Sequence, residues 1–199
     1  CLWPTDMTLI LASASPRRAD LLGQLGLSAK ICPADIDESV RLGELPDDYA
    51  LRIAQEKADV IAQRYPAAVV LAADTAIDLD GRILGKPGNR AEAAKMLCAL
   101  SDRGHRVLSA IAVSQGGVQH AELVATEVFF GPLSNRDIND YLASGEADDK
   151  AGSYAIQGRA AQFVQRINGS YSGVVGLPLY ETRKALREVG IEPPTALAE

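Results

Sequence analysis

The stretch LASASPRR, Leu11 to Arg18, reads as the end of a buried strand followed at once by the start of a helix. Ser15 suits the residue that caps a helix, because its hydroxyl can accept a hydrogen bond from an unpaired backbone N–H group. Pro16 suits the first helical position, where its missing N–H costs nothing. Leucines then recur at helical spacing as far as Gly26, which ends the pattern. The stretch predicts a strand that turns directly into a helix, the local unit of an α/β fold.

Two arginines, Arg17 and Arg18, occupy the first turn of this helix. The start of a helix already carries partial positive charge, and each cation placed there loses about 0.3–1 kcal/mol. A bound anion would remove the conflict, and strand–turn–helix junctions commonly hold phosphate on their backbone N–H groups. Alternatively, both arginines reach back to acidic residues elsewhere in the chain. This stretch alone leaves both interpretations open.

The composition fits a folded chain with a local, not a general, affinity for anions. The 199 residues suit one large domain or two closely joined lobes, and a hydrophobic content of 47% is enough for a well-buried core. The net charge of −6 argues against a nucleic-acid partner, which usually meets a basic excess. Any anionic ligand must therefore be met by a local cluster of basic residues.

The cysteines and the apolar runs bear on the cellular compartment. Cys1, Cys32 and Cys98 form no CxxC pair and are odd in number, which favours a reducing compartment over a disulfide framework. No apolar run approaches the roughly 18–20 residues of a membrane span, and the first residues do not resemble a signal peptide. We therefore expect a cytoplasmic protein with no membrane partner. Cys98 follows an apolar pattern at helical spacing, so we expect it in the core.

The hydrophobic pattern alternates between strand and helix periods along the chain, with hairpin signals in between. It predicts an α/β domain with a mixed sheet. Residues 1–6 look like an extension before Met7, residues 7–190 a single catalytic domain, and residues 191–199 a loose tail. Strands are expected at 8–12, 68–75, 106–113 and 122–130, helices at 16–25, 47–64, 90–100, 135–144 and 178–189, and hairpins around 80–81, 115–117 and 168–169.

Two lysines stand out from these elements. Lys57 falls beside the apolar stripe of its helix, where it must either extend outward to water or find a buried anion. Extension outward is the commoner outcome, since the spacing alone shows no partner. Lys86 directly follows the hairpin strand in ILGKPG. The run from Gly81 to Lys86 is not a P-loop, because its spacing is one residue short and Pro87 has no hydroxyl for magnesium.

Two acids accompany these basic residues. Asp74 ends the apolar strand VVLAAD. Ligands of open α/β sheets bind at the carboxyl ends of the strands, so this position suits a site residue. The alternative is that Asp74 caps a loop. Glu38 lies in the loop DIDES; the alternative is that this is simply an exposed acidic loop with no role in a site. His105 and His120 are solitary and suggest neither a zinc site nor a triad. With no nucleophile motif in the chain, we do not expect covalent catalysis.

Taken together, a series of motifs from Met7 to about Val189 resembles the Maf family of nucleoside triphosphate pyrophosphatases, and within it the subgroup that acts on dTTP and UTP. Any one motif would be a weak signal, whereas the series in order and at compatible spacing is specific. The motifs are SASPRR at 13–18, DIDE ending at Glu38, EKA around Lys57, AADT ending at Thr75, GKP around Lys86, DKAGSYAIQG at 149–158 and INGSYSGVVGLPLYET at 167–182.

The resemblance implies a reaction and a fold. A nucleoside triphosphate is cut between its α- and β-phosphates, giving the monophosphate and pyrophosphate. The implied fold is an elongated mixed sheet flanked by helices, with two lobes and the active site in the cleft between them. The family also implies a divalent cation, Mg²⁺ or Mn²⁺, and frequent dimers, which leaves a homodimer open here.

The resemblance also assigns residues. The position of Asp74 is the family's proton acceptor, and the positions of Arg17, Thr75 and Gln157 distinguish the substrate subgroups. Arg, Thr and Gln mark the dTTP/UTP subgroup, whereas the subgroup acting on 7-methyl-GTP typically has a bulky residue after the proline and a Glu in place of the Gln. This chain matches the first pattern at all three positions.

Charge chemistry supports this assignment independently. A triphosphate carries about four negative charges, and Arg17, Arg18, Lys57 and Lys86 supply four positive ones. Our hypothesis is that Asp74 activates the attacking water, directly or as a metal ligand, and that Glu38 helps to hold the metal. The expected catalytic residues are Asp74, Glu38, Lys57 and Lys86, the expected metal ligands are Asp74 and Glu38, and the expected substrate-binding residues are Ser13, Ser15, Arg17, Arg18, Thr75 and Gln157.

Two other functions stay open at this point. The chain could be a nucleotide-sensing regulator of cell division with little turnover, because family members have been linked to septum formation. It could also be a house-cleaning enzyme that removes modified pyrimidine nucleotides.

Overall fold

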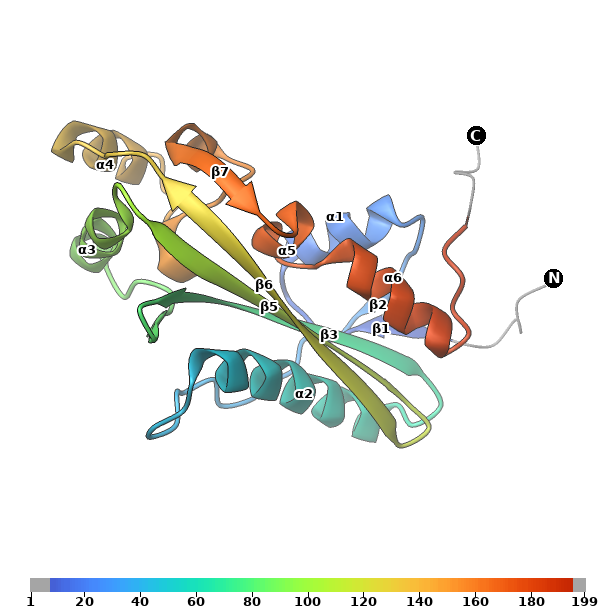
Figure 1. Ribbon diagram of the computed structural model, residues 1–199. Coiled ribbons are helices and arrows are strands. Elements are labelled where there is room, and N and C mark those ends of the chain that lie inside the picture. The colour runs from blue at the N-terminus through green and yellow to red at the C-terminus, as the bar shows by residue number, and fades with distance from the viewer. Residues whose placement is uncertain (1–7, 195–199) are drawn as a thin grey trace.

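One mixed sheet of seven strands runs the length of the molecule in the computed structural model, which describes residues 8–194 (Figure 1). The strand order is β2-β1-β3-β5-β6-β7, and β4 pairs with β3 outside this path. β1 is parallel to β2 and to β3, and every other pairing is antiparallel, which confirms the predicted mixed sheet. The strands are β1 Leu9–Leu11, β2 Lys30–Ile31, β3 Val69–Leu79, β4 Arg82–Leu84, β5 Gly104–Gln115, β6 Val118–Phe130 and β7 Val164–Asn168.

The helices cover both faces of the sheet and one of its ends. α2 lies along one face, α1, α5 and α6 lie on the opposite face, and α3 and α4 gather with β7 at one end (Figure 1). The helices are α1 Pro16–Gln24, α2 Pro46–Arg64, α3 Arg90–Leu100, α4 Asn135–Leu142, α5 Tyr171–Val175 and α6 Leu179–Glu188, with short 3-10 helices at Ala151–Ser153 and Arg159–Phe163. Within residues 8–194, no helix has both the length and the apolar character that a membrane span needs.

Local signals set several of these boundaries as predicted. The Asn89 side chain accepts a hydrogen bond from the Glu92 backbone N–H at the start of α3. Ser134 and Asp137 form a complete capping box at the start of α4. Asp80 and Gly81, both at positive φ, make the turn between β3 and β4, so this predicted hairpin is also confirmed.

Three hydrophobic clusters hold the helices to the sheet. On the α2 face, small side chains such as Ala54, Ala58 and Ala72 bring the helix close to the strands. On the opposite face, α1 and α6 bury leucines against β1, β3 and β5. The third cluster fills the end of the molecule where α3 and α4 pack against β5 and β6. The sheet therefore joins two lobes that have separate cores, at the α1/α2 end and at the α3/α4 end.

β3 is longer than the sequence predicts, and this changes the position of Asp74. The strand continues to Leu79, so Asp74 lies in its middle and not at its end. On one side, β3 pairs with β5 from Val70 to Asp78. On the other side, the pairing with β1 stops at Leu71 and the pairing with β4 covers only Ile77 to Leu79. In the described chain no strand pairs with this edge between those two points, so Asp74 lies at a gap in the sheet.

Three further expectations are wrong. The Asn168–Gly169 stretch forms no hairpin, because β7 pairs with β6 and Gly169 leads into α5. Ser15 takes the cap position of α1, but its side chain makes no capping hydrogen bond. Cys98 is exposed on the outer side of α3, because Ala93, Leu97 and Leu100 form the buried face of that helix.

The ends of the chain are described only in part. Residues 1–7, which include the expected extension, and residues 195–199 of the expected tail lie outside the described residues. Ile191, the first residue of that expected tail, is buried with the α1 and α6 side chains, and its N–H donates to the Leu186 carbonyl.

Candidate active site

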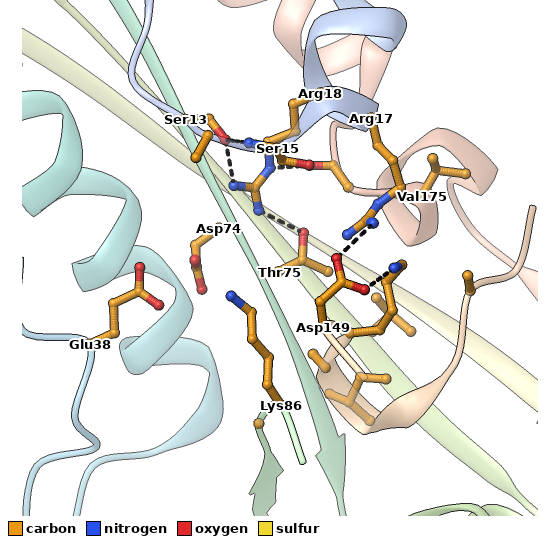
Figure 2. A pocket seen from close by; sticks show the side chains of 18 of the residues that line it. Ser13, Ser15, Arg17, Arg18, Glu38, Asp74, Thr75, Lys86, Asp149 and Val175 are labelled. Atoms are coloured by element: carbon orange, nitrogen blue, oxygen red, sulfur yellow. Dashed lines mark hydrogen bonds and ion pairs between the residues drawn. The ribbon is translucent and has the colours of Figure 1, made fainter. Parts of the chain in front are cut away.

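A cleft of about 680 Å³ opens at the gap in β3 (Figure 2). Its walls are the start of α1, the loop before α2, the segment after β4 and the loop at 149–157. Every residue that the sequence predicts for the site lines this cleft, namely Ser13, Ser15, Arg17, Arg18, Glu38, Lys57, Asp74, Thr75, Lys86 and Gln157. Segments far apart in the sequence therefore bring basic, acidic and amide groups to one place.

At the base of the cleft, the Lys57 ammonium lies between two carboxylates. Its Nζ is 2.7 Å from Glu38 Oε1 and 2.8 Å from Asp74 Oδ1. Lys57 is only 7% exposed, so the expectation that it extends outward is wrong and the buried-anion alternative is right. The three side chains together carry a net charge of −1, from two carboxylates and one ammonium.

The packing of α2 explains why this lysine points inward. Ile53, Ala54, Ala58 and Ile61 are buried against the sheet, and Lys57 lies among them on the same face. Because Asp74 occupies the facing gap in β3, the ammonium meets a carboxylate there and not hydrocarbon. An unpaired charge at this depth would be costly, so the two side chains require each other.

Glu38 is held as a carboxylate by its surroundings. Burial alone would raise its pKa, but the hydrogen bond and charge of Lys57, with smaller contributions from Lys86 and Arg18, bring the pKa below its ordinary value. Burial, and then the negative charges of Asp74 and Glu38, raise the pKa of the neighbouring Tyr49 to about 12. Tyr49 therefore stays a neutral hydroxyl, which donates to the Glu38 backbone carbonyl at 3.0 Å.

Arg18 is a cation held in place by neutral groups. Its Nε donates to the Gly176 carbonyl at 2.9 Å, and its other nitrogens donate to Ser13 Oγ at 3.2 Å and Thr75 Oγ1 at 3.4 Å (Figure 2). Loss of hydration lowers its pKa, and the Asp74 charge offsets only part of this effect. The alternative that Arg18 reaches back to an acid is therefore wrong among the described residues. Its position suits an anion that arrives from outside.

Arg17 and Lys86 differ in how their charges are met. Arg17 Nη1 lies 3.9 Å from Asp149 Oδ2, at the limit of an ion pair, and Asp149 also contacts the Lys150 ammonium (Figure 2). For Arg17, the alternative of an acidic partner is thus correct in part. Lys86 extends into the cleft toward Asp74 in Figure 2 and, within the described range, makes no hydrogen bond or ion pair. The cleft therefore retains basic groups that are free to meet phosphate.

The sequence prediction missed several residues that shape this cleft. Asp149 and Lys150 open the motif DKAGSYAIQG, so the signal for them was present in the sequence. Gly176, which contributes its carbonyl to Arg18, likewise belongs to the motif at 167–182. No local signal marks Tyr49, whose hydroxyl donates to a backbone carbonyl of another segment. Ser13 mainly positions its neighbours, since its hydroxyl accepts hydrogen bonds from the Ser15 N–H and from the Arg18 guanidinium.

The loop at 149–157 is anchored on three sides. The Gly152 N–H donates to the Gly85 carbonyl at 3.0 Å, next to Lys86. The Ala155 N–H donates to the Tyr141 hydroxyl at 3.1 Å, and the Tyr154 hydroxyl lies 2.8 Å from His105 Nε2. These contacts hold Gln157 at the cleft, where the residue is exposed.

The acid pair suits a divalent cation that is shared with a ligand. Glu38 and Asp74 each contact the Lys57 ammonium through one carboxylate oxygen, and the described residues hold no group of three or more His, Cys, Asp or Glu side chains that could enclose a metal by themselves. Mg²⁺ is usually bound through one or two carboxylates together with substrate phosphates, and not in an all-protein cage. The residues present fit that mode of binding.

Comparisons with known proteins show which family and which fold the chain resembles. Residues 8–189 match the family described as Maf-like protein. A dTTP/UTP pyrophosphatase of Anaeromyxobacter dehalogenans is 51% identical over 190 residues, which cover 94% of this chain and 96% of the relative. A protein of the same name from Cereibacter sphaeroides is 51% identical over 186 residues, covering 93% and 96%. The structure of a HAM1 protein from Coxiella burnetii is similar in fold, with a TM-score of 0.51 at 19% identity over 92% of this chain and 100% of that chain.

Proposed function

The chain belongs to the Maf-like protein family, and from that premise we propose that it hydrolyses dTTP and UTP between the α- and β-phosphates to the monophosphate and pyrophosphate. One observation carries the proposal. A buried lysine holds two carboxylates at the base of a cleft whose other wall presents Arg18 and Lys86, which form no ion pair with any described acidic residue. This arrangement separates a site for polyphosphate from a site for activating water.

The basic side chains bind and polarise the triphosphate. Arg18 offers a planar fork that is already oriented by Gly176 and Thr75, while Lys86 acts as a mobile point charge. Arg17 exchanges its long contact with Asp149 for phosphate oxygens. As the bond to the α-phosphate breaks, negative charge moves onto the pyrophosphate, and these cations stabilise it there.

Asp74 is the base that accepts a proton from the attacking water. Its Oδ1 is fixed by Lys57, which leaves Oδ2 to face the cleft without a hydrogen bond among residues 8–194. A fixed carboxylate orients the water toward the α-phosphorus, and positioning is the main source of catalysis in phosphoryl transfer. Lys57 thus serves as the positioning residue for Asp74 as well as a partner of Glu38.

Glu38 and Asp74 are the residues that would hold a divalent cation, Mg²⁺ or Mn²⁺, together with phosphate oxygens. When bound, such a cation supplies Lewis-acid neutralisation of phosphate charge beside the two carboxylates.

Gln157 is placed to read the pyrimidine. Uracil and thymine present one N–H donor between two carbonyl acceptors, which a side-chain amide can match. In the described part of the chain the Gln157 amide makes no hydrogen bond, so both of its groups are available to a base. The Thr75 hydroxyl contacts Arg18 and lies 3.4 Å from Ser109 Oγ, so its influence on specificity runs through the position of Arg18.

Product analysis in ¹⁸O-labelled water tests the proposal. The protein is incubated with dTTP, UTP, CTP, ATP, GTP and 7-methyl-GTP, with magnesium or with EDTA, and pyrophosphate and orthophosphate are measured separately. We expect pyrophosphate and monophosphate from dTTP and UTP, with the label in the monophosphate, because water attacks the α-phosphorus. Orthophosphate with a nucleoside diphosphate, or label in the pyrophosphate, would contradict the proposed reaction.

The regulator of cell division is the weaker candidate. A protein that only senses nucleotides gains nothing from two carboxylates placed beside phosphate, because they repel the ligand. Tight nucleotide binding without turnover in the same assay would favour it. Action on modified pyrimidine nucleotides is tested by adding them to the panel. A homodimer and a cytoplasmic location remain predictions; light scattering on the purified protein tests the first and fractionation the second.

A further inference from the structure

The loop that carries Glu38 is long, and its apolar packing is confined to its start, where Cys32 and Ala34 lie against the core. Fourteen residues, 32–45, connect β2 to α2 without a helix or strand. Three of its large apolar side chains point to solvent, with exposures of 51% for Val40, 108% for Leu42 and 63% for Leu45. A loop of this kind has many conformations of similar free energy, yet Glu38 must reach the Lys57 ammonium to within 2.7 Å.

Arg52, on α2, contacts this loop at two points. Its guanidinium forms a bidentate pair with Glu44, with distances of 2.5 Å from Nε to Oε1 and 2.9 Å from Nη2 to Oε2. The same Nη2 donates to the Ser39 carbonyl at 3.0 Å, directly after Glu38. The side chains of Arg52 and Glu44 are only 13% and 8% exposed, so water competes weakly for these bonds.

Further contacts close the loop around this pair. The Arg41 N–H donates to Glu44 Oε2 at 2.9 Å, and the Arg41 side chain pairs with Glu56 on α2 at 2.8 Å. The Tyr49 hydroxyl donates to the carbonyl of Glu38 itself. The hydrogen bonds from Arg52 lower the pKa of Glu44 to about 2, so Glu44 stays charged throughout the neutral range. The backbone at Glu38 and the loop after it are thereby tied to α2, the helix that also carries Lys57.

We propose that Glu44 and Arg52 are positioning residues that set the place of the Glu38 carboxylate in the cleft. Their effect on turnover rests on the proposed function; their effect on the loop does not. Neither side chain lines the cleft, so neither contacts the nucleotide. A displacement of a catalytic group by about 1 Å can reduce turnover about 100-fold, so loosening this loop should reduce kcat.

The test combines Glu44→Gln and Arg52→Lys with a double-mutant cycle. Glu44→Gln removes the charge but keeps the shape, and Arg52→Lys keeps the charge but loses the fork. We expect each to lower kcat for dTTP about 10- to 100-fold with KM changed less than about threefold, because the phosphate and base contacts come from other segments. In a Glu38→Gln background, Glu44→Gln should change kcat less than about twofold, since the residue it positions is already disabled.

The matched control is Asp80→Asn, which removes the ion pair with Arg103 at the β3–β4 turn, outside the cleft, and should leave kcat unchanged. Equal losses from Glu44→Gln with and without Glu38→Gln would overturn the proposal, as would an unchanged kcat in both single variants.

Hydrogen exchange of peptides covering 32–45 tests the loop without any turnover. We expect faster exchange there in Glu44→Gln and Arg52→Lys, with no change in β3 or β5, and unaltered exchange would overturn the proposal. If the wild-type protein hydrolyses no nucleotide, the proposed function fails while this exchange measurement still decides the role of the pair. If melting shows that one variant is unfolded, the other decides.

Discussion

At the scale of single residues, the Lys57 ammonium organises two carboxylates that would otherwise repel each other. Glu38 comes from a loop and Asp74 from a strand, and both lie within 2.8 Å of the same nitrogen. The two carboxylates compensate the charge of the buried Lys57 ammonium, and the ammonium in turn fixes the positions of both carboxylates without any nucleotide. Lys57 therefore occupies, in the free protein, the position between the carboxylates that a divalent cation would need.

This competition predicts that the free protein binds divalent cations weakly. Replacing Lys57 by Met removes the competing charge and leaves two unpaired carboxylates, so its affinity for Mn²⁺ without nucleotide should rise at least about tenfold. Electron paramagnetic resonance of free Mn²⁺ in a titration measures this directly. An affinity equal to that of the wild type would show that Lys57 does not exclude the metal.

A second prediction at this scale concerns Gln157. Replacing it by Glu removes the N–H donor that would meet a pyrimidine carbonyl, so kcat/KM for dTTP and UTP should fall at least about tenfold relative to purine nucleotides. The control is Gln162→Glu, the same change at a glutamine outside the cleft. An unaltered substrate preference would remove Gln157 from the reading of the base.

At the scale of elements, the cleft owes its place to the gap in the pairing of β3. β1 and β4 pair with the same edge of β3 but leave its middle open, and Asp74 and Thr75 lie in that middle. The start of α1 follows β1 directly and so brings Arg17 and Arg18 to the same opening. A long strand with interrupted partners thus serves as a rigid base for side chains from several loops.

The loop at 149–157 depends on a glycine that touches this strand. A Cβ on Gly152 would lie 2.5 Å from Ile77 Cδ1, and its φ is +65°. We expect Gly152→Ala to destabilise the protein about 1–3 kcal/mol more than Gly43→Ala, because overpacking adds to the backbone strain. Gly43 also has positive φ, +75°, but no atom of the described residues lies within 4 Å of the added Cβ. Urea unfolding of both variants measures the difference, and equal losses would mean that the contact with Ile77 is not restrictive.

Elements with local signals could be predicted from the sequence, and elements set by distant partners could not. The caps at Asn89 and Ser134 depend on residues three positions away, and both are confirmed. The end of β3 depends on β4 and β5, so Asp74 was wrongly expected at a strand end. Asn168–Gly169 looked like a hairpin turn, but β7 finds its partner about forty residues earlier, in β6.

The same distinction applies to the site. Asp74, Lys86 and the arginines belong to recognisable motifs, and all of them line the cleft. The burial of Lys57 could not be predicted, because its partners come from a different strand and loop. The Arg52–Glu44 pair was also missed, since charged residues at such positions are ordinarily surface polar groups and only the path of the loop gives them a role.

At the scale of the whole molecule, stability should depend on pH through a buried histidine in the α3/α4 lobe. His105 packs edge-on against Phe130 and Tyr154, and no group within residues 8–194 forms a hydrogen bond with its Nδ1. Burial, with a smaller contribution from Arg103, lowers its pKa from 6.5 to about 4. The folded protein therefore resists protonation at a pH where the unfolded chain already binds the proton.

The sign of the effect follows from that shift. Between pH 6.5 and about 4 the unfolded state gains a proton that the folded state does not, so acidification should weaken folding, and the effect should level off below about pH 4. At pH 5 this single group should cost about 2 kcal/mol relative to pH 7. Melting curves of the wild type and His105→Gln from pH 7 to pH 5 measure the difference, and parallel losses in both proteins would exclude His105 as the cause.

The net charge of −6 and the basic cleft show how local and overall charge differ in this molecule. Acids pair with the surface cations, as in the contact of Asp47 with Arg106, while Lys86 remains without such a partner among the described residues. The affinity for a polyphosphate should therefore fall as the salt concentration rises, because salt screens the few basic side chains of the cleft. The molecule as a whole should have no general affinity for nucleic acid.

The central claim is that the carboxylate of Asp74 drives water attack in a cleft whose other groups bind the nucleotide. Asp74→Asn tests it most directly, with kcat measured for dTTP and the dissociation constant measured by calorimetry on the same preparation. The account predicts a loss of kcat of at least about 1,000-fold with the dissociation constant changed less than about threefold. A variant that keeps near-native kcat would contradict the account.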